Sequence, residues 1–191
     1  MRRLTPLLLA ALAALAAGCG NERQRAPDTA GAAPPAGKRT VELRRYGVTF
    51  VRPANWGLAD PKPPQIGALT SGPVAVILWR YPREERLPVS SSELERARSA
   101  LVAAARARDA SLKVLHTRVV RVDGVPGVEV VATEKIGIAR RQVRSTHLYA
   151  HGGELVVDAY APPSEFPKVD RAVFGPLLRS LRLSRPAPRA S

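Results

Sequence analysis

The chain has 191 residues, 45% of them hydrophobic, and its 30 Lys and Arg against 16 Asp and Glu give a net charge of +14. This hydrophobic content suffices for a packed core and excludes a wholly disordered chain. A single cysteine excludes an internal disulfide framework and a thiolate-rich metal cluster. The positive charge favours anionic partners.

Residues 1–18 have the layout of a secretory signal peptide. Arg2 and Arg3 precede an apolar run from Leu7 to Ala17, which is shorter than the roughly 20 residues of a membrane-spanning helix. The small residues that lead to Cys19 resemble the lipobox of bacterial lipoproteins. This resemblance implies export, acylation of the Cys19 thiol with chains such as palmitate, and anchoring to the outer face of the cytoplasmic membrane. The alternative is an ordinary signal peptide with an incidental cysteine.

The mature chain divides into three parts. Residues 19–40 hold the lipidated cysteine and a Pro-, Ala- and Gly-rich segment without a large hydrophobic residue after Cys19, which predicts a flexible stalk. Residues 41–183 are long enough for one domain with its own core. Residues 184–191 are predicted to be a disordered basic tail.

The first half of the domain begins with strand patterns. Tyr46–Val51 and Pro73–Trp79 are rich in β-branched and aromatic residues, and the prolines between Pro61 and Pro64 predict a loop. Ser90 and Glu93 have the spacing of a capping box, and apolar residues then recur at helical intervals. A helix is therefore expected from Ser90 to Asp109.

Two hairpins and a last helix are expected next. The turns are predicted at Asp123-Gly124 and Gly152-Gly153, which suit positive φ. The strands are predicted at residues 113–122, 127–136, 141–150 and 154–161. Because both faces of the second hairpin carry hydrophobic residues, the sheet needs cover on both sides. A helix from Lys168 to Ser180, with a kink or late start at Pro176, supplies one cover.

The order of elements and several short motifs resemble those of PsbP-like domains. The opening strand Tyr46–Phe50 is followed by Pro53-Ala54-Asn55-Trp56. Gly124 and Gly127 form a G-x-x-G motif at the first hairpin, and the last helix closes at Ser180–Leu183. The resemblance covers residues 41–183. It implies an α+β fold, specifically an α/β/α sandwich with a largely antiparallel central sheet covered by helices on both faces. It also implies a binding or accessory role, with no catalytic residue to carry over.

A catalytic site is not expected from the residue pattern. A turn at Gly152-Gly153 would place His147 opposite Asp158, with Ser145 on the same face, but same-face neighbours on a strand stand about 7 Å apart. The spacing of His147 and His151 spans about 13 Å on a strand, too far for one metal ion. We therefore predict no enzyme, metal or cofactor. A hydrolase remains the third hypothesis.

Two sets of residues are candidates for binding. Trp56 and Trp79 either belong to the core or line a pocket. The densest basic groups form an anion site if they converge in space and a solvated surface if they do not. These candidate anion contacts are Arg44, Arg45, Arg80, Arg83, Arg86, Arg140, Arg141 and Arg144.

The sequence favours a membrane-anchored, non-enzymatic binding module at the cell envelope. Its partner would be an envelope protein, a lipid or an anionic polymer. Nucleic acid is disfavoured because the chain is exported and lacks an aromatic stacking platform. The alternative is a carrier of a lipid or small amphiphile, which requires a pocket larger than about 300 Å³ between helix and sheet.

Overall fold

The computed structural model describes residues 31–187, so the predicted signal peptide and Cys19 lie outside the described residues. The helical elements are α1 (Ser91–Arg108), α2 (Phe166–Val169), a π-helical turn η2 (Asp170–Phe174), α3 (Gly175–Ser180) and a short 3₁₀ turn η1 (Arg44–Tyr46). The strands are β1 (Arg39–Leu43), β2 (Val48–Arg52), β3 (Gly57–Ala59), β4 (Gln65–Ser71), β5 (Val74–Pro82), β6 (Lys113–Val122), β7 (Val125–Ile136), β8 (Ala139–Ala150), β9 (Gly153–Ala161) and β10 (Arg182–Leu183).

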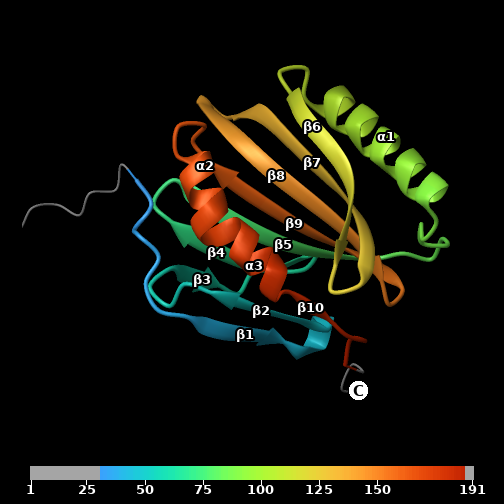
Figure 1. Ribbon diagram of the computed structural model, residues 1–191, viewed down its shortest axis with the longest axis horizontal. Helices are drawn as coiled ribbons and strands as arrows, with labels where there is room; N and C mark the ends of the chain where they lie inside the picture. The colour runs from blue at the N-terminus through green and yellow to red at the C-terminus, as the bar shows by residue number, and fades with distance from the viewer. Residues whose placement is uncertain (1–30, 188–191) are drawn as a thin grey trace, which may run out of the picture.

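The strands form a large and a small sheet (Figure 1). The large sheet has seven strands in the order β3-β4-β5-β9-β8-β7-β6, and all of its neighbouring pairs are antiparallel. The small sheet, β1-β2-β10, joins the beginning and the end of the domain. The predicted α+β class with a mainly antiparallel sheet is therefore confirmed.

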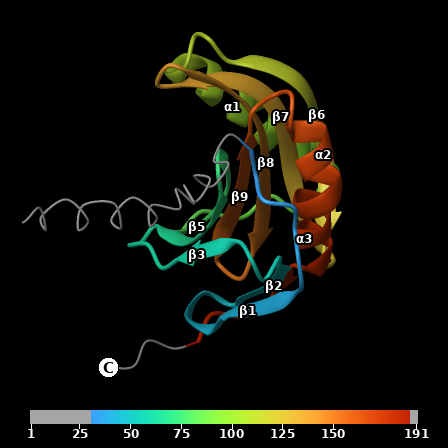
Figure 2. The same cartoon turned by 90° about the vertical axis from the view of Figure 1, so that its left-hand side faces the viewer.

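The larger core contains the C-terminal helical segment. Phe166, Val173 and Leu177 cluster with Leu148 and Leu155 of the sheet, and all five side chains are at most 5% exposed. The smaller core lies beneath α1, where Leu94 packs with residues of β7 and β8 that include Tyr149. Leu148 and Tyr149 are neighbours in β8, and successive strand residues point to opposite faces. The two helical segments thus contact opposite sets of β8 side chains, and Figure 2 shows α2 and α3 along one side of β7 and β8.

The local signals for α1 and the first hairpin are confirmed. The Ser90 hydroxyl accepts from the Glu93 backbone N–H, and the Glu93 carboxylate accepts from the Ser90 backbone N–H, so both halves of the capping box are present. Asp123 and Gly124 form the turn between β6 and β7 with φ of 52° and 75°. These elements depend on neighbouring residues alone, which explains why the pattern predicted them.

Residues at both ends of the described chain contact the domain. The stalk was predicted to extend to residue 40, but the Trp56 indole N–H donates to the Ala33 carbonyl at 3.1 Å, and β1 already begins at Arg39. The tail was predicted to begin at residue 184, but the Ser184 and Ala187 N–H groups donate to backbone carbonyls of residues 47 and 44. Backbone groups at each end of the described chain thus form hydrogen bonds with the domain.

The C-terminal helical segment begins earlier than predicted and continues through Pro176. The Gly175 N–H donates to the Asp170 carbonyl in the wider π-helical turn, and Pro176 stands in the first turn of α3. Proline lacks an N–H to donate within the helix, and its ring crowds the preceding turn. The wider π-helical turn just before Pro176 accommodates both effects. Strands β1, β3 and β4 were not predicted, and none of the helices within residues 31–187 is long and apolar enough to cross a membrane.

Candidate functional site

A groove of about 570 Å³ lies between α1 and the strands β5, β7, β8 and β9. Helix α1 packs mainly against β6 and β7, so it does not cover β5 and β9 on the same face of the sheet. The apolar wall includes Leu101 of α1 with Val130, Val143 and Val156 of the sheet. The groove is therefore a recess between a helix and a sheet, with one apolar side.

Aromatic residues from two neighbouring strands form another part of the wall. Trp79 and Tyr81 alternate onto the same face of β5, and their rings stack with centroids 6.4 Å apart and an angle of 11° between planes. Tyr160 of β9 lines the same groove. Burial, together with the nearby Asp158 carboxylate, raises the pKa of the Tyr160 phenol, which therefore keeps its proton and can donate a hydrogen bond.

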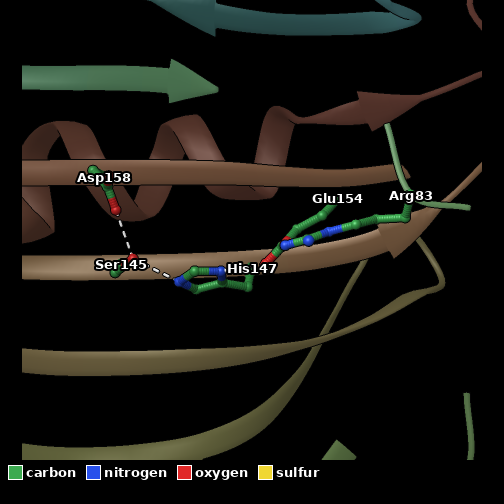
Figure 3. A network of polar contacts seen from close by, with 5 residues as sticks. All are labelled: Arg83, Ser145, His147, Glu154 and Asp158. Carbon is green, nitrogen blue, oxygen red and sulfur yellow. Dashed lines mark hydrogen bonds and ion pairs between the residues drawn. The ribbon is translucent and has the colours of Figure 1, made fainter. Parts of the chain in front are cut away.

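A continuous set of polar contacts crosses the floor of the groove (Figure 3). Arg83 bonds to Glu154, whose other carboxylate oxygen lies 2.6 Å from Nδ1 of His147. Nε2 of His147 lies 3.0 Å from the Ser145 hydroxyl, which donates to Asp158 at 2.6 Å. We call these five residues the polar chain. Its members come from β8, β9 and the segment after β5.

The register of β8 and β9 assembles the polar chain. The hairpin turn consists of His151 and Gly152, with φ of 51° and 69°, and Ala150 pairs with Gly153. Ser145 therefore stands opposite Asp158. The predicted turn at Gly152-Gly153 and the predicted pairing of His147 with Asp158 are wrong, because the positive-φ pair lies one residue earlier.

The predicted separation of Ser145 and His147 is also wrong at the level of the side chains. Their backbones are two residues apart on one strand, but the long imidazole leans along the strand and reaches the hydroxyl. Glu154, which sequence reasoning missed, is opposite Tyr149 and diagonal to His147. The available signal was its same-face parity with Asp158 in β9.

The two carboxylates of the polar chain have opposite electrostatic environments. Burial opposes the ionisation of Glu154, but hydrogen bonds from His147 and Arg83 outweigh it and lower the pKa of this carboxyl. Burial raises the pKa of Asp158, and the hydrogen bond from Ser145 only partly offsets it. Glu154 is thus the stable anion beside Arg83, and Asp158 is the carboxyl that holds a proton more readily.

The geometry does not support a serine nucleophile. The Ser145 hydroxyl donates to Asp158, so its proton points away from His147. Strand β8 is paired with β7 on one side and β9 on the other at this position, so its backbone N–H groups belong to the sheet. An acyl-transfer site needs free donors for the developing oxyanion. Within residues 31–187 no group of three or more His, Cys, Asp or Glu side chains is arranged to hold a metal ion.

We expect the Asp158→Asn variant to gain stability relative to the unsubstituted chain as pH rises. Because the native pKa of Asp158 is raised, the native state binds the proton more tightly than the unfolded state does, so unfolding free energy falls as pH rises above about 4 through the native pKa. Asparagine removes that dependence and can still accept from Ser145. Urea denaturation at a series of pH values measures the difference. Parallel pH profiles would contradict the prediction, and Asp60→Asn, at an exposed position, is the control.

The candidate anion-binding arginines are distributed over several places. Arg44 pairs with Glu42, and Arg45 lies over the Tyr46 ring with 5.8 Å between the guanidinium carbon and the ring centroid. Buried Arg80 donates to the carbonyls of Ala150 and His151, which ties β5 to the β8–β9 turn. Arg45 and Arg80 also border a hollow of about 530 Å³ that includes Pro63 and Pro64.

The remaining candidates have other positions. Arg83 belongs to the polar chain, and Arg86 pairs with Glu93 at the start of α1. Arg140 and Arg141 lie near the β7–β8 turn, opposite Lys135 and Glu134. Arg144 forms ion pairs with Glu129 and Asp170, on the opposite side of β8 from Ser145.

The two tryptophans are in different environments. Trp56 is 3% exposed and belongs to the larger core. Trp79 lines the groove and stacks on Tyr81. Of the two candidate pocket residues, only Trp79 therefore lies beside the groove.

Solved structures share this architecture. Cyanobacterial PsbP (CyanoP) from Synechocystis sp. PCC 6803 superposes with a TM-score of 0.58 at 12% identity, over 78% of this chain and 94% of that one. The fold is PsbP-like. LpqN of Mycobacterium tuberculosis, involved in cell envelope biogenesis, gives a TM-score of 0.54 at 13% identity, over 78% and 91% of the two chains. The Saccharomyces cerevisiae Ran-binding protein Mog1p gives 0.53 at 9% identity, over 78% and 97%.

Comparisons of sequence give no match. Neither a protein-family model nor a curated protein matches the chain. At 9–13% identity the structural likeness establishes the PsbP-like fold alone. The function has to be argued from the groove and the polar chain.

Proposed function

We propose that this chain is a non-enzymatic binding module of the bacterial cell envelope that holds a small amphiphile in the groove beneath α1. The groove is the observation that carries the proposal. Its volume of about 570 Å³ exceeds the roughly 300 Å³ that the carrier hypothesis requires. Its combination of an apolar wall with a few converging polar groups is typical of small-molecule sites.

A second hollow gives room for the apolar part of such a ligand. It has a volume of about 350 Å³ and shares Arg83, Leu101, Ala104 and Glu154 with the groove. Its other lining residues include Leu87, Pro88, Ala97 and Tyr149, so its wall is mainly apolar. The Arg83–Glu154 ion pair borders both spaces. A hydrocarbon chain in the second hollow would leave the polar end of the molecule beside the polar chain.

The polar end of the ligand would meet both donors and acceptors. Asp158 accepts hydrogen bonds when ionised, and the protonated Tyr160 phenol donates one. A hydroxyl group on the ligand can donate and accept at once, so it suits both residues. Burial of unpaired polar groups is costly, and a ligand that lacks a hydroxyl would bind less tightly.

The structural neighbours support a binding role at the level of the fold. Mog1p is a Ran-binding protein, and LpqN is involved in cell envelope biogenesis. The predicted α/β/α sandwich is supported by the two cores on opposite sets of β8 side chains. The alternative is that this module binds a protein partner instead of a small amphiphile.

Export and lipid anchoring are part of the proposal. Their support is the order of Arg2, Arg3, the apolar run and Cys19. We expect Cys19→Ser to move the exported protein from the membrane fraction to the soluble fraction of a bacterial host, and to abolish labelling by a palmitate analogue. Fractionation with immunoblotting measures the first effect. A substituted chain that is still labelled and sedimented would contradict the anchor.

Filling the groove should weaken binding of an amphiphile at least tenfold. Ala105 lines the groove on α1, so Ala105→Phe adds a ring to the space, whereas Ala103→Phe adds the same ring at an exposed position outside it. The measurement is fluorescence titration of 11-(dansylamino)undecan-1-ol, an amphiphile that ends in a hydroxyl group, into the mature chain carrying Cys19→Ser. We expect the dissociation constant to change less than twofold in the control. An unsubstituted chain without saturable binding contradicts the proposal and favours the protein partner.

A further inference from the structure

A second site, independent of the groove, lies between the C-terminal helical segment and the end of β6. This hollow has a volume of about 820 Å³ and is lined by five arginines from separate parts of the chain. They are Arg118, Arg121, Arg144, Arg171 and Arg179. We call it the arginine hollow. Only Arg144 belongs to the basic groups that the sequence singled out, because the others converge through the fold.

A buried carboxylate holds two of these arginines in place. Glu129 is 2% exposed, and its two oxygens accept from Nε of Arg118 and Nε of Arg144, each at 2.8 Å. Arg144 also donates through Nη1 to Asp170 at 2.6 Å. Because Glu129 takes the Nε groups, both guanidinium groups are oriented while terminal N–H donors remain for a ligand. The Arg118 and Arg144 guanidinium groups are thus held in place before any ligand binds.

The hollow carries an excess of positive charge. Asp123, one of its two acidic lining residues, is 3.6 Å from the guanidinium of Arg182, which lies outside the lining. The five lining arginines then face Asp170 and Glu129, which leaves three positive charges. Arg171 and Arg179 are exposed and form no ion pair with the residues the structure describes. An anion entering the hollow would gain these two partners without displacing an existing pair.

The chemistry of the donors selects the anion. Guanidinium groups present paired N–H donors that match the oxygens of phosphate, and several around one recess can contact a phosphate from more than one side. The volume of the hollow exceeds that of a phosphate alone, so an organic substituent on the phosphate also fits. We propose that the arginine hollow binds a phosphate ester, carried either by a lipid headgroup or by a soluble phosphorylated molecule.

The test uses two double variants with the same change in charge. Arg171→Gln with Arg179→Gln removes two lining arginines that form no ion pair within residues 31–187 and leaves in place Arg121, which donates to the Gly124 carbonyl. Arg96→Gln with Arg106→Gln removes two exposed arginines of α1 that do not line it. Isothermal titration calorimetry of the mature chain carrying Cys19→Ser with glycerol 1-phosphate measures binding of a soluble phosphate ester. Flotation with phosphatidylglycerol vesicles measures binding of a phosphate ester in a lipid headgroup, and phosphatidylcholine vesicles are the comparison.

We expect saturable binding of at least one phosphate probe, weakened at least tenfold by the hollow variant and less than twofold by the α1 variant. Binding of phosphatidylglycerol vesicles alone would assign the ester to a lipid, and binding of glycerol 1-phosphate would assign it to a soluble ligand. Equal weakening by both variants would mean a general charge effect and overturn the proposal. Absence of binding to both probes would overturn it as well, while leaving the groove proposal untouched.

Discussion

Replacing Glu129 with alanine is expected to lower the unfolding free energy by about 3–5 kcal/mol, the usual cost of breaking a buried ion pair from one side. Glu129 is 2% exposed and joins Arg118 of β6 to Arg144 of β8 across β7. Removing it leaves Arg144, whose side chain is 14% exposed, with only Asp170 as a charged partner. Most of the expected loss comes from this partly unpaired buried charge.

Urea denaturation followed by circular dichroism measures the loss for Glu129→Ala. Glu95→Ala is the matched control, because Glu95 also pairs with an arginine, Arg98, but is 52% exposed. Exposed pairs contribute up to about 1 kcal/mol, so the control should stay within that range. Equal losses in the two variants would show that Glu129 does not act as a buried anchor.

Truncating Phe174 to alanine should also cost about 3–5 kcal/mol, because a buried phenylalanine leaves a cavity that the core fills only in part. Phe174 is 1% exposed, and its ring centroid lies 5.7 Å from that of Phe166. It stands at the end of the π-helical turn, where the C-terminal helical segment crosses the larger core. The variant therefore tests whether this segment is an essential layer of the domain.

Chemical denaturation of Phe174→Ala gives the magnitude. Ile138→Ala is the control, since this isoleucine at the β7–β8 turn is 104% exposed and should change the unfolding free energy by less than about 0.5 kcal/mol. A loss below about 1 kcal/mol at Phe174 would mean that the C-terminal segment packs only loosely on the sheet.

The accuracy of the sequence predictions follows the range of the interactions involved. Helix α1 and the Asp123-Gly124 turn were predicted correctly because capping and positive φ act between residues a few positions apart. The second hairpin shows the limit. Three residues, His151, Gly152 and Gly153, could supply its turn, and only the pairing of whole strands selected the first two.

The candidate site was predicted less accurately than the secondary structure. Sequence reasoning noted Ser145, His147 and Asp158, but it missed Glu154 and placed His147 opposite Asp158. A one-residue error in the turn shifts the opposing residue by two, so it keeps the face and changes the partner. The groove itself depends on where α1 lies on the sheet, which no local pattern specifies.

The amino-acid sequence by itself determined the α+β class, α1 with its capping box, the β6–β7 turn and the general positions of the four long strands. Each depends on periodicity, composition or contacts within a few residues. Tertiary structure alone decided that residues 31–38 lie on the domain, that the polar chain forms, and that five arginines meet around one hollow. The physical reason is that Arg118, Arg144 and Arg179 are brought together by Glu129 and by packing of the C-terminal helical segment, which join residues far apart in the chain.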